Sequence, residues 1–395
     1  MYVQIFFLLT FIEKRKSIIV KNILVRLAHF PLISIIIPCW NEEKGIEKTI
    51  LSLLALDYPK DKLDICIVDD GSTDGTWAIV QKYITHPSIC AFTKENGGKF
   101  SALNLGLTKI KGEYVACLDA DSRVEPDVFQ KMLPRFTDPA VMAVIPAAIL
   151  EHPETLIQRA QKVEYTMAVF FKKILSILNG LHVTPGTLPL YRSEVFAKIG
   201  NFRPGHQGED MEMAFRMHAA RMKIDQVHDA VVYTIPPRTV RTLFRQRTRW
   251  IYAFLNNLID YRKMLFGSHG NFSWFTLPTS IISIVAVIGV FFFSIYNIIS
   301  YITKAVARVH FGGFHPTYFT PNFDLFYFGS PTIFLIVFAY ALVFCSIGIG
   351  YYMVEKRLPL SYNFILFVVV YSVVSPFWIM KAIYKVAFSR QMAWR

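Results

Sequence analysis

Acidic side chains follow a predicted strand of this chain at a spacing that could bind a metal ion. Asp119 and Asp121 come directly after an apolar run at 114–118. Side chains two residues apart share one face while the chain stays extended, and carboxylate oxygens are the ligands that hard divalent cations prefer. The same pair could instead form a solvated acidic turn. These two residues therefore permit a metal site but do not by themselves establish one.

Polar clusters also follow two other predicted strands. An Asn-Glu-Glu triplet at 41–43 comes after the β-branched run at 33–38, and an Asp-Asp pair at 69–70 comes after the apolar run at 63–68. Nearly continuous apolar strands that alternate with helices predict a parallel sheet covered on both faces. Ligands of such sheets bind outside the carboxyl ends of the strands. We therefore expect three polar clusters on one rim of the sheet.

The segments between these strands have the apolar spacing of helices and of further short strands. Helices are expected at 41–56, 73–83, 98–110 and from about 126, and strands at 89–93 and within 141–149. Ser72 or Thr73 is available to cap the helix at 73–83.

Lys99 stands beside two glycines at the start of the predicted helix at 98–110. A lysine at a helix N-terminus is well placed for phosphate, because the exposed N–H groups and the helix dipole favour anions there. The alternative is an ordinary surface lysine in a loop. No dinucleotide-binding or P-loop glycine pattern follows any predicted strand. An acidic rim beside Lys99 instead suits a nucleoside diphosphate ester, which binds through a metal bridge and through hydrogen bonds.

The net charge of +13 over 395 residues narrows the classes of partner. Strong basicity suits nucleic acid, anionic lipid or a phosphorylated substrate. No sequence signature of a DNA- or RNA-binding module accompanies the charge, so we expect no nucleic acid partner. Hydrophobic residues make up 53% of the chain and concentrate toward its C-terminus. This distribution indicates a water-exposed part joined to a membrane part.

A second acidic pair, Glu209 and Asp210, opens a predicted helix further along the chain. A carboxylate just ahead of a helix can serve only as an N-cap, a role that Asp performs often. The alternative is a general base, since a carboxylate can deprotonate a substrate hydroxyl. Both interpretations are compatible with the position of this pair.

Basic residues dominate the segment at 238–250, which contains no acid. Its arginines are Arg238, Arg241, Arg245, Arg247 and Arg249. On a helix, Gln246, Arg249 and Trp250 share one face. Arginine can clamp a leaving diphosphate, and an indole offers a stacking surface for a sugar or base. The alternative is a basic helix at the membrane surface that contacts anionic headgroups. Both interpretations hold if Arg238, Arg241 and Arg245 contact lipid while Arg249 contacts substrate.

Four motifs resemble those of the inverting family 2 glycosyltransferases, which have a GT-A domain. They are Ile36-Ile-Pro-Cys-Trp-Asn-Glu-Glu43, Val68-Asp-Asp-Gly-Ser-Thr-Asp-Gly75, Gly98-Lys-Phe-Ser-Ala-Leu-Asn104 and Leu118-Asp-Ala-Asp121. The resemblance covers about 33–260. It implies an α/β, Rossmann-like GT-A fold with a mostly parallel sheet and a nucleotide sugar donor, expected to be UDP-linked.

The resemblance also implies roles for the motif residues. Asp70 would contact the nucleoside, and Asp121 supported by Asp119 would hold Mg²⁺ or Mn²⁺ against the diphosphate. In the similar Glu-Asp motif of membrane polysaccharide synthases the Asp is the base. That role falls here to Asp210, with Glu209 as a supporting group.

Gln246-Arg-Thr-Arg-Trp250 is similar to the Gln-(Gln/Arg)-x-Arg-Trp signature of processive enzymes such as hyaluronan, chitin, cellulose and poly-N-acetylglucosamine synthases. Ceramide glucosyltransferases, which add one sugar, carry a related pattern. The resemblance implies that Gln246, Arg247 and Arg249 contact the nucleotide diphosphate together with Lys99. Trp250 would contact both the donor and the acceptor.

Two segments between these motifs bear on the acceptor side. The stretch at 184–192 resembles the glycine-rich loop that lines the acceptor site in the family, which assigns Gly186 to acceptor binding. The segment at 155–180 has the apolar spacing of an amphipathic helix, with Lys172 and Lys173 at one edge of the apolar stripe. It lies either on the membrane surface or against the catalytic domain.

Long apolar segments near the C-terminus predict transmembrane helices. The candidates are 277–300, 331–353 and 361–380, each long enough for a hydrocarbon core of about 30 Å. The third contains Ser375 and Pro376, and a proline usually kinks such a helix. The aromatic stretch at 311–328 is expected to be an interfacial loop, with a sugar-stacking platform as the alternative. So few spans leave translocation of a polymer by one chain in doubt.

The membrane topology has one conflict. With the catalytic domain in the cytosol, the basic loop at 355–357 lies inside, as positively charged loops tend to. The basic tail from Lys381 to Arg395 then lies outside. Either the third segment does not span fully, or the N-terminus adds a span, or the tendency fails here. The apolar run at 1–11 is too short to span and is expected to be an interfacial anchor or the remnant of a longer span.

Four regions follow from these patterns. They are an N-terminal interfacial or partial membrane segment at 1–30, a GT-A catalytic domain at 31–235, a basic interface helix at 236–270 and a transmembrane region at 271–395.

The predicted function is metal-dependent, inverting transfer of a sugar to a growing glycan by an integral protein of the cell membrane. The alternative is transfer of one sugar to a membrane lipid. A further alternative is a non-enzymatic receptor or pore that binds sugar, in which the carboxylates would have no catalytic role. The expected partners are the donor, a glycan or lipid acceptor, membrane lipids and other copies of the chain.

Overall fold

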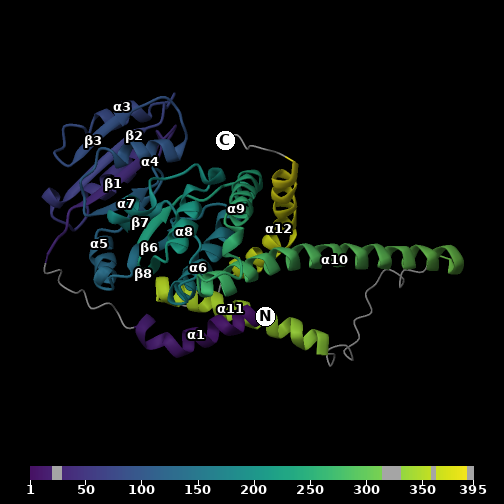
Figure 1. Cartoon of the computed structure of the whole chain (residues 1–395). Coiled ribbons are helices and arrows are strands. Elements are labelled where there is room, and N and C mark those ends of the chain that lie inside the picture. Colours follow the sequence, from purple (N-terminus) through teal and green to yellow (C-terminus); the bar gives the residue numbers. More distant parts are fainter. Residues whose placement is uncertain (20–28, 314–330, 357–361, 389–395) are drawn as a thin grey trace.

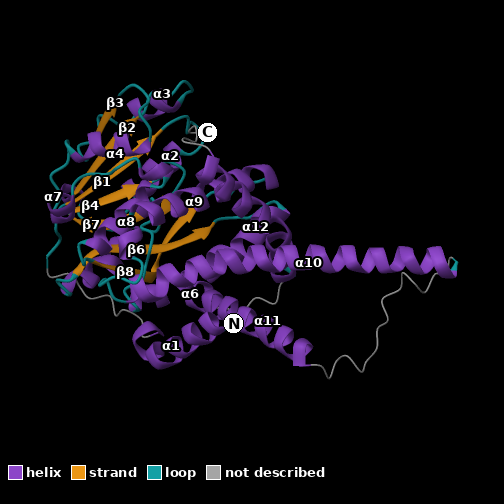
Figure 2. Ribbon diagram, turned by 45° about the vertical axis from the view of Figure 1, so that its right-hand side comes forward, coloured by secondary structure: helices purple, strands orange, loops and turns teal. Residues whose placement is uncertain are grey.

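The computed structural model describes residues 1–19, 29–313, 331–356 and 362–388. Within these residues, eight strands form one sheet that lies between helices, and long apolar helices extend from it (Figure 1, Figure 2). The strands are β1 (Ile33–Cys39), β2 (Leu63–Asp69), β3 (Ile89–Thr93), β4 (Tyr114–Leu118), β5 (Arg123–Val124), β6 (Val141–Leu150), β7 (Thr187–Arg192) and β8 (Lys223–Thr234). The strands predicted at 33–38, 63–68, 89–93, 114–118 and within 141–149 are confirmed.

The sheet has the order β3-β2-β1-β4-β7-β6-β8-β5. Its first four strands are parallel, so Ile33 of β1 pairs with Leu63 on one side and Tyr114 on the other. β7 runs antiparallel between β4 and β6, β8 is parallel to β6, and the edge strand β5 is antiparallel. The predicted α/β fold is confirmed. The parallel arrangement holds for the N-terminal half of the sheet, whereas the C-terminal half is mixed.

Helices flank the sheet and continue beyond it. They are α1 (Tyr2–Ile19), α2 (Ile46–Leu54), α3 (Thr76–Gln81), α4 (Lys99–Leu107), α5 (Val128–Met132), α6 (Leu156–Ile177), α7 (Glu194–Ile199), α8 (Glu209–Ala219), α9 (Val240–Asp260), α10 (Leu277–Gly312), α11 (Pro331–Glu355) and α12 (Asn363–Phe388).

Two apolar cores lie on the two faces of the sheet. Ile35 and Ile37 of β1 belong to one core with α2 and α5, whereas Ile36 belongs to the other with α4 and α8. This alternation follows from the two-residue period of a strand. Because both faces are buried, β1 consists almost entirely of apolar residues, and every one of its seven positions is buried. The sheet thereby forms a rigid support for the loops that leave its carboxyl ends.

The start of α3 differs from the sequence prediction. The helix begins at Thr76, and its N-cap residue is Gly75, which has no side chain to cap it. The Ser72 hydroxyl binds the Asp69 carboxylate instead, and Asp74 Oδ1 accepts a hydrogen bond of 3.0 Å from the Thr76 backbone N–H. The predicted cap at Ser72 or Thr73 is therefore wrong, because local hydrogen bonds in the preceding turn use the hydroxyl group.

α6 lies between the sheet and the C-terminal helices. On one side Lys173 Nζ donates to the Gln226 carbonyl of β8 at 2.6 Å and lies 3.3 Å from Asp225 Oδ1. On the other side α6 packs against α11 and α12. Thr155 and Gln158 form a capping box at its N-terminus. The amphipathic segment thus lies against the domain on one face and against apolar helices on the other.

α12 packs along α9 rather than away from it. Leu243 of α9 shares an apolar cluster with Trp378 and Ile379, and Lys381 Nζ lies 5.1 Å from the centre of the Phe244 ring. The helix continues through Pro376. The basic end of α12 therefore lies beside α9 of the sheet domain.

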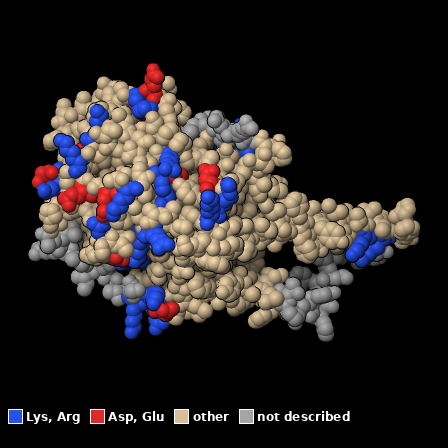
Figure 3. All heavy atoms as spheres, viewed as in Figure 1, with Lys and Arg blue, Asp and Glu red and all other residues tan. Residues whose placement is uncertain are grey.

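Three helices of the described residues are long and apolar enough to cross a membrane, namely those at Phe272–Gly312, Ile333–Glu355 and Asn363–Phe388. They include most of the three segments predicted from the sequence. α10 extends well beyond the rest of the molecule (Figure 1). On the face shown in Figure 3, charged side chains gather over the sheet domain, and the arm formed by α10 carries them only near its outer end. The predicted aromatic loop at 311–328 lies mostly outside the described residues.

α1 packs against the helices beside the sheet. The Phe7 ring centre lies 5.6 Å from that of Phe171 in α6 and 5.8 Å from that of Phe275. α1 also contacts α11. The N-terminal apolar run is therefore a helix held against the same group of helices that includes the candidate membrane spans.

Candidate active site

The structure brings the three predicted polar clusters to the carboxyl edge of the parallel strands. The Thr73 backbone N–H donates to Asn41 Oδ1 at 2.8 Å, which joins the loop after β1 to the loop after β2. The Thr49 hydroxyl of α2 donates to the Ala120 carbonyl at 2.8 Å, which joins α2 to the turn between Asp119 and Asp121. The residues at this edge thus come from β1, β2 and β4, as the sequence pattern predicts.

Asp70 organises the loop that leads to α4. Its carboxylate accepts hydrogen bonds from the backbone N–H groups of Gly97 at 3.0 Å and Gly98 at 2.8 Å, and Lys94 Nζ donates to it at 2.7 Å. Gly98 has a positive φ of 87°, a conformation that glycine adopts without strain. Asp70 therefore fixes the backbone just ahead of Lys99, while its contact with a nucleoside remains a prediction.

Lys99 bridges two acidic segments that are far apart in the sequence. Its Nζ lies 2.6 Å from Asp119 Oδ1 and 3.2 Å from Glu209 Oε1. Burial alone would lower the pKa of Lys99, but the carboxylates of Asp119 and Glu209 outweigh burial and hold that pKa well above its usual value. Lys99 is therefore a permanent positive charge at the centre of the edge.

Gly186 passes directly over this ion pair. Its carbonyl accepts a hydrogen bond of 2.9 Å from the Asp119 backbone N–H. A Cβ atom at Gly186 would lie 2.5 Å from Lys99 Nζ and 2.6 Å from Asp119 Oδ1. The close approach of backbone to charged side chains explains why the chain has glycine here.

Asp121 has more negative charge around it than positive. Burial raises the pKa of Asp121 to about 7, and the carboxylates of Asp119 and Glu42 add to the shift. Only the Ser122 hydroxyl, 3.2 Å from Asp121 Oδ1, donates to it in the hydrogen bonds of the described residues. Those residues contain no group of three or more His, Cys, Asp and Glu side chains that could hold a metal ion alone. A Mg²⁺ or Mn²⁺ ion fits at Asp121 if substrate phosphates supply its other ligands, as is usual for Mg²⁺.

Asp210 begins α8 beside Glu209. Its backbone carbonyl accepts a hydrogen bond of 2.8 Å from the Thr184 hydroxyl. Burial raises the pKa of Asp210 to about 6, and the Glu209 carboxylate adds to the shift. Lys99 and Arg249 oppose it. A carboxylate with a pKa this close to neutrality is suited to act as a general base.

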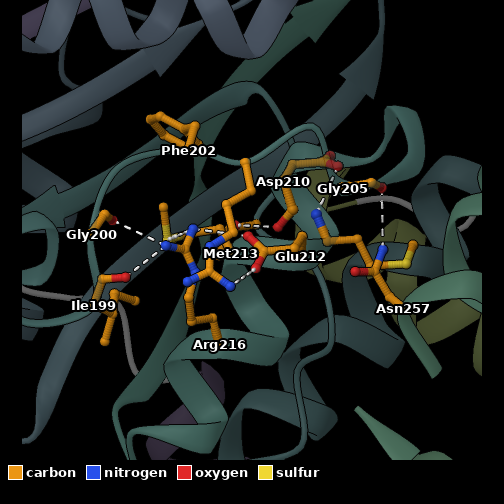
Figure 4. A network of polar contacts seen from close by, with 12 residues as sticks. Ile199, Gly200, Phe202, Gly205, Asp210, Glu212, Met213, Arg216 and Asn257 are labelled. Carbon is orange, nitrogen blue, oxygen red and sulfur yellow. Dashed lines mark hydrogen bonds and ion pairs between the residues drawn. The ribbon is translucent and has the colours of Figure 1, made fainter. Parts of the chain in front are cut away.

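The loop just before Asp210 is held in an unusual conformation by α9. Three consecutive residues, Gly205, His206 and Gln207, have φ between 53° and 69°. Asn257 of α9 donates to the Gly205 carbonyl at 3.3 Å, as Figure 4 shows, and Arg249 Nη1 donates to the Gln207 carbonyl at 3.1 Å. Positive φ at a non-glycine residue costs about 1–3 kcal/mol and persists only where contacts impose it. The position of Asp210 therefore depends on α9.

Comparisons with known proteins identify the domain that carries this edge. Residues 34–200 match the family model described as Glycosyl transferase family 2. Residues 34–200 form a family 2 glycosyltransferase domain. The GT-A architecture expected from the four sequence motifs is thereby confirmed, and the protein is a glycosyltransferase.

Curated relatives extend the similarity beyond that domain. The chain is 26% identical over 308 residues to a poly-beta-1,6-N-acetyl-D-glucosamine synthase of Staphylococcus epidermidis, which covers 76% of this chain and 71% of the relative. It is 28% identical over 221 residues to the enzyme of the same name from Staphylococcus aureus strain COL, covering 55% and 53%. Among solved structures, a mannosyltransferase of Pyrobaculum calidifontis matches 98% of this chain and 97% of its own, with a TM-score of 0.62 and 18% identity. That structural match concerns the fold alone.

A buried network supports α8 of the glycosyltransferase (Figure 4). Arg216 Nη2 donates to Glu212 Oε2 at 2.8 Å, and the Tyr261 hydroxyl donates to Glu212 Oε1 at 2.7 Å. Arg216 Nη1 also donates to the carbonyls of Ile199 at 2.6 Å and Gly200 at 3.2 Å. α8 is thus tied to α7 and to the end of α9, which fixes the helix that carries Asp210.

The residues of the Gln-x-x-Arg-Trp segment point in different directions. Arg249 reaches the loop before Asp210, and Trp250 is 37% exposed. Gln246 is half-buried, and its Oε1 accepts no hydrogen bond from the described residues. Arg247, in contrast, is buried and binds Glu164 of α6. Arg247 therefore differs from the other residues predicted to contact the diphosphate, because its charge is buried and already paired with Glu164.

Three polar residues of α6 near this site escaped the sequence prediction. Burial raises the pKa of Tyr165 to about 12, and Asp121 and Glu164 are among the charges that act on it. Burial lowers the pKa of Lys172 to about 8, and Asp210 and Glu164 oppose that shift. Glu164, Tyr165 and Lys172 lie on one side of the helix at intervals of one and seven residues. These three residues lie within about 100° of one another around the helix, at one edge of the apolar stripe, and this polar edge was the signal available in the sequence.

Proposed function

We propose that this glycosyltransferase is a membrane polysaccharide synthase that transfers N-acetylglucosamine from a UDP-linked donor to a growing glycan. The names of its relatives support this sugar and a polymeric product. The main support for the proposal is the pair of ion pairs that Lys99 forms. One is with Asp119, after strand β4, and the other is with Glu209, the residue before Asp210. Donor-binding and acceptor-activating groups thus meet at one point.

The donor diphosphate would lie against Lys99 and Arg249. Both side chains are positive and act on the pKa of Asp210, so they lie near the same carboxylate. Gln246 would add a hydrogen bond from the same helix. Asp70 would orient the nucleoside through the loop at 96–98 that it holds.

A divalent ion, Mg²⁺ or Mn²⁺, would be held by Asp121 with support from Asp119. The raised pKa of Asp121 supports this assignment, because a nearby cation would stabilise its ionised form. Asp119 is already paired with Lys99, which leaves Asp121 as the principal ligand. The similar mannosyltransferase was solved with GDP-Man and Mn²⁺. Such an ion would neutralise the charge that develops on the departing diphosphate.

Asp210 would take the proton of the acceptor hydroxyl. The acceptor oxygen then forms a bond to the anomeric carbon, while the bond from that carbon to the diphosphate oxygen breaks and UDP leaves with the electron pair. Direct displacement of this kind inverts the anomeric configuration. Glu209 would support the base by holding Lys99, and Gly186 and Trp250 would contact the acceptor. General base catalysis of this kind contributes about 10²–10⁴-fold to the rate.

The catalytic domain would face the cytosol, where nucleotide sugars are made, and the apolar helices would anchor the protein in the cell membrane. The basic residues near the start of α9, Arg238, Arg241 and Arg245, are exposed and would contact anionic headgroups. If one chain has too few spans to translocate a polymer, a second copy of the chain would supply the additional spans.

The test is to incubate the purified protein in detergent with a panel of UDP-sugars and Mn²⁺ and to measure product size. A ladder of products from UDP-N-acetylglucosamine supports the synthase. A single addition to a lipid would support the ceramide glucosyltransferase-like alternative instead. If no nucleotide sugar is turned over, the proposed function is wrong.

A further inference from the structure

Three helices, α6, α9 and α12, meet at one carboxylate oxygen beside the catalytic domain. Glu164 Oε2 of α6 accepts a hydrogen bond of 2.5 Å from Arg247 Nη2 of α9 and another of 2.5 Å from the Tyr371 hydroxyl of α12. Arg247 is only 4% exposed. The Glu164 carboxylate compensates the buried charge through Nη2, while Nε and Nη1 of Arg247 are buried without a hydrogen-bond partner among the described residues. Glu164, Arg247 and Tyr371, here called the interface triad, therefore tie a candidate membrane helix to the catalytic domain.

Arg247 also covers one face of Trp250. Its guanidinium carbon lies 4.0 Å from the centre of the indole ring, a cation–π contact. Trp250 nevertheless remains 37% exposed. Because the guanidinium occupies one face, the exposed surface belongs to the other face and the edge of the indole. Arg247 thus fixes the plane of a ring whose free side can receive a ligand.

Arg247 cannot share the direction of Arg249. Residues two apart on an α-helix differ by about 200° around its axis. Arg249 Nη1 donates to the Gln207 carbonyl in the loop before Asp210, so it faces the base. Arg247 faces α6 and α12 instead. The two guanidinium groups therefore leave α9 in different directions, that of Arg249 toward the loop before Asp210 and that of Arg247 toward Glu164 of α6.

We propose that Arg247 is a positioning residue, held by Glu164 and Tyr371, that sets the orientation of Trp250 at the acceptor end of the site. It is not a ligand of the diphosphate. The inference deepens the proposed function and rests on it. Through this contact, the position of α12 in the membrane is coupled to the binding of the acceptor sugar.

Variants that preserve shape test the inference best, since removing one partner of a buried ion pair can unfold a protein. Arg247→Lys keeps the charge but lacks the planar group that stacks on an indole. Glu164→Gln keeps the size of the side chain and removes its charge. Each variant is purified as the full chain in detergent, and its thermal unfolding is compared with that of the wild type.

The measurement is steady-state transfer from UDP-N-acetylglucosamine to a β-1,6-linked N-acetylglucosamine tetramer. Both variants should raise the KM for the tetramer about tenfold and leave the KM for the donor within about twofold, because the interaction lost concerns acceptor binding. Glu164→Asp should restore part of the loss. Trp250→Ala should raise the KM for the tetramer as well, and adding Arg247→Lys to it should cause no further loss. Residues that act through one group give such non-additive effects.

Lys162→Gln is the matched control. Lys162 also lies on α6 and forms an ion pair with a C-terminal helix, at 2.7 Å from Glu355, but Trp250 is not among its contacts. Its KM for the tetramer should not change.

Two results would overturn the inference. The first is an increase in the donor KM of Arg247→Lys with an unchanged tetramer KM, which would make Arg247 a diphosphate ligand. The second is an additive effect of Arg247→Lys and Trp250→Ala. A wild-type protein that does not turn over UDP-N-acetylglucosamine would overturn the proposed function first, and the inference with it.

Discussion

Lys99 Nζ lies 2.6 Å from Asp119 Oδ1, and the same nitrogen lies 3.2 Å from Glu209 Oε1. One cation thus joins the start of α4, the end of β4 and the start of α8. The carboxylate expected to support the metal and the residue beside the expected base therefore share a charge. Their relative position is the geometric basis of the proposed reaction.

Gly186→Ala should disturb this ion pair without unfolding the protein. The added Cβ would lie 2.5 Å from Lys99 Nζ and 2.6 Å from Asp119 Oδ1, and both are side-chain ends that can move aside. A displacement of about 1 Å at such a site can lower activity about 10²-fold. We expect a loss of that order in UDP release, with little change in thermal unfolding. Gly289→Ala in α10, where no atom lies within 4 Å of the added Cβ, is the control. Full activity of Gly186→Ala would contradict the assigned geometry.

Asp121→Ala should abolish the dependence of nucleotide binding on a divalent ion. Asp121 is the carboxylate left without a cationic partner when Lys99 pairs with Asp119. We expect UDP to bind about tenfold or more weakly in Mn²⁺, a loss of at least about 1.4 kcal/mol, and to bind equally with and without the ion. Asp61→Ala, at an exposed turn, should bind UDP like the wild type. Titration of UDP by calorimetry measures both. Retained Mn²⁺ dependence in Asp121→Ala would place the metal elsewhere.

The transfer rate should fall as the pH drops below about 6. Burial raises the pKa of Asp210 to about 6, and a general base must be deprotonated to act. About half of the base is active at pH 6 and about nine tenths at pH 7, above which the rate levels off, whereas at pH 5 about a tenth remains active. The profile of kcat/KM between pH 5 and 8 at saturating Mn²⁺ tests this. A rate independent of pH across the range would rule out Asp210 as the titrating base.

Sequence patterns were sufficient to predict the strands of the parallel half of the sheet and the polar residues at their carboxyl ends. Apolar runs end at Asp69 and Asp119 because parallel strands are buried on both faces and ligands bind where they stop. β8 could not be predicted in the same way, since polar residues interrupt it. One of them, Asp225, pairs with Lys173 of α6, and no local pattern reveals that partner.

β7 and the interface triad were missed for related reasons. β7 contains Pro189 and follows Gly186, so its sequence is typical of a loop. Glu164 and Tyr371 are 207 positions apart, and their contact depends on how α12 packs. The resemblance of Gln246-Arg-Thr-Arg-Trp250 to the synthase signature also did not show that Arg247 turns away from Arg249.

Glu212→Gln should lower stability far more than a surface change of the same type. Glu212 is 4% exposed and accepts hydrogen bonds from Arg216 and Tyr261, so its loss leaves the Arg216 charge buried without a carboxylate. Breaking a buried pair in this way costs about 3–5 kcal/mol. Glu194→Gln, which removes an exposed pair with Lys198, should cost about 0.5 kcal/mol or less. Thermal unfolding in detergent compares them. Equal unfolding temperatures would show that the network of Figure 4 does not stabilise α8.

Asp210 is the proposed base of a glycosyltransferase that uses a UDP-sugar. The most direct measurement is UDP release from UDP-N-acetylglucosamine with Mn²⁺ by the wild type and by Asp210→Asn, together with the affinity of each for UDP. We predict turnover by the wild type, a loss of about 10²–10⁴-fold in Asp210→Asn, and equal UDP affinity. Wild-type turnover in Asp210→Asn would contradict the account.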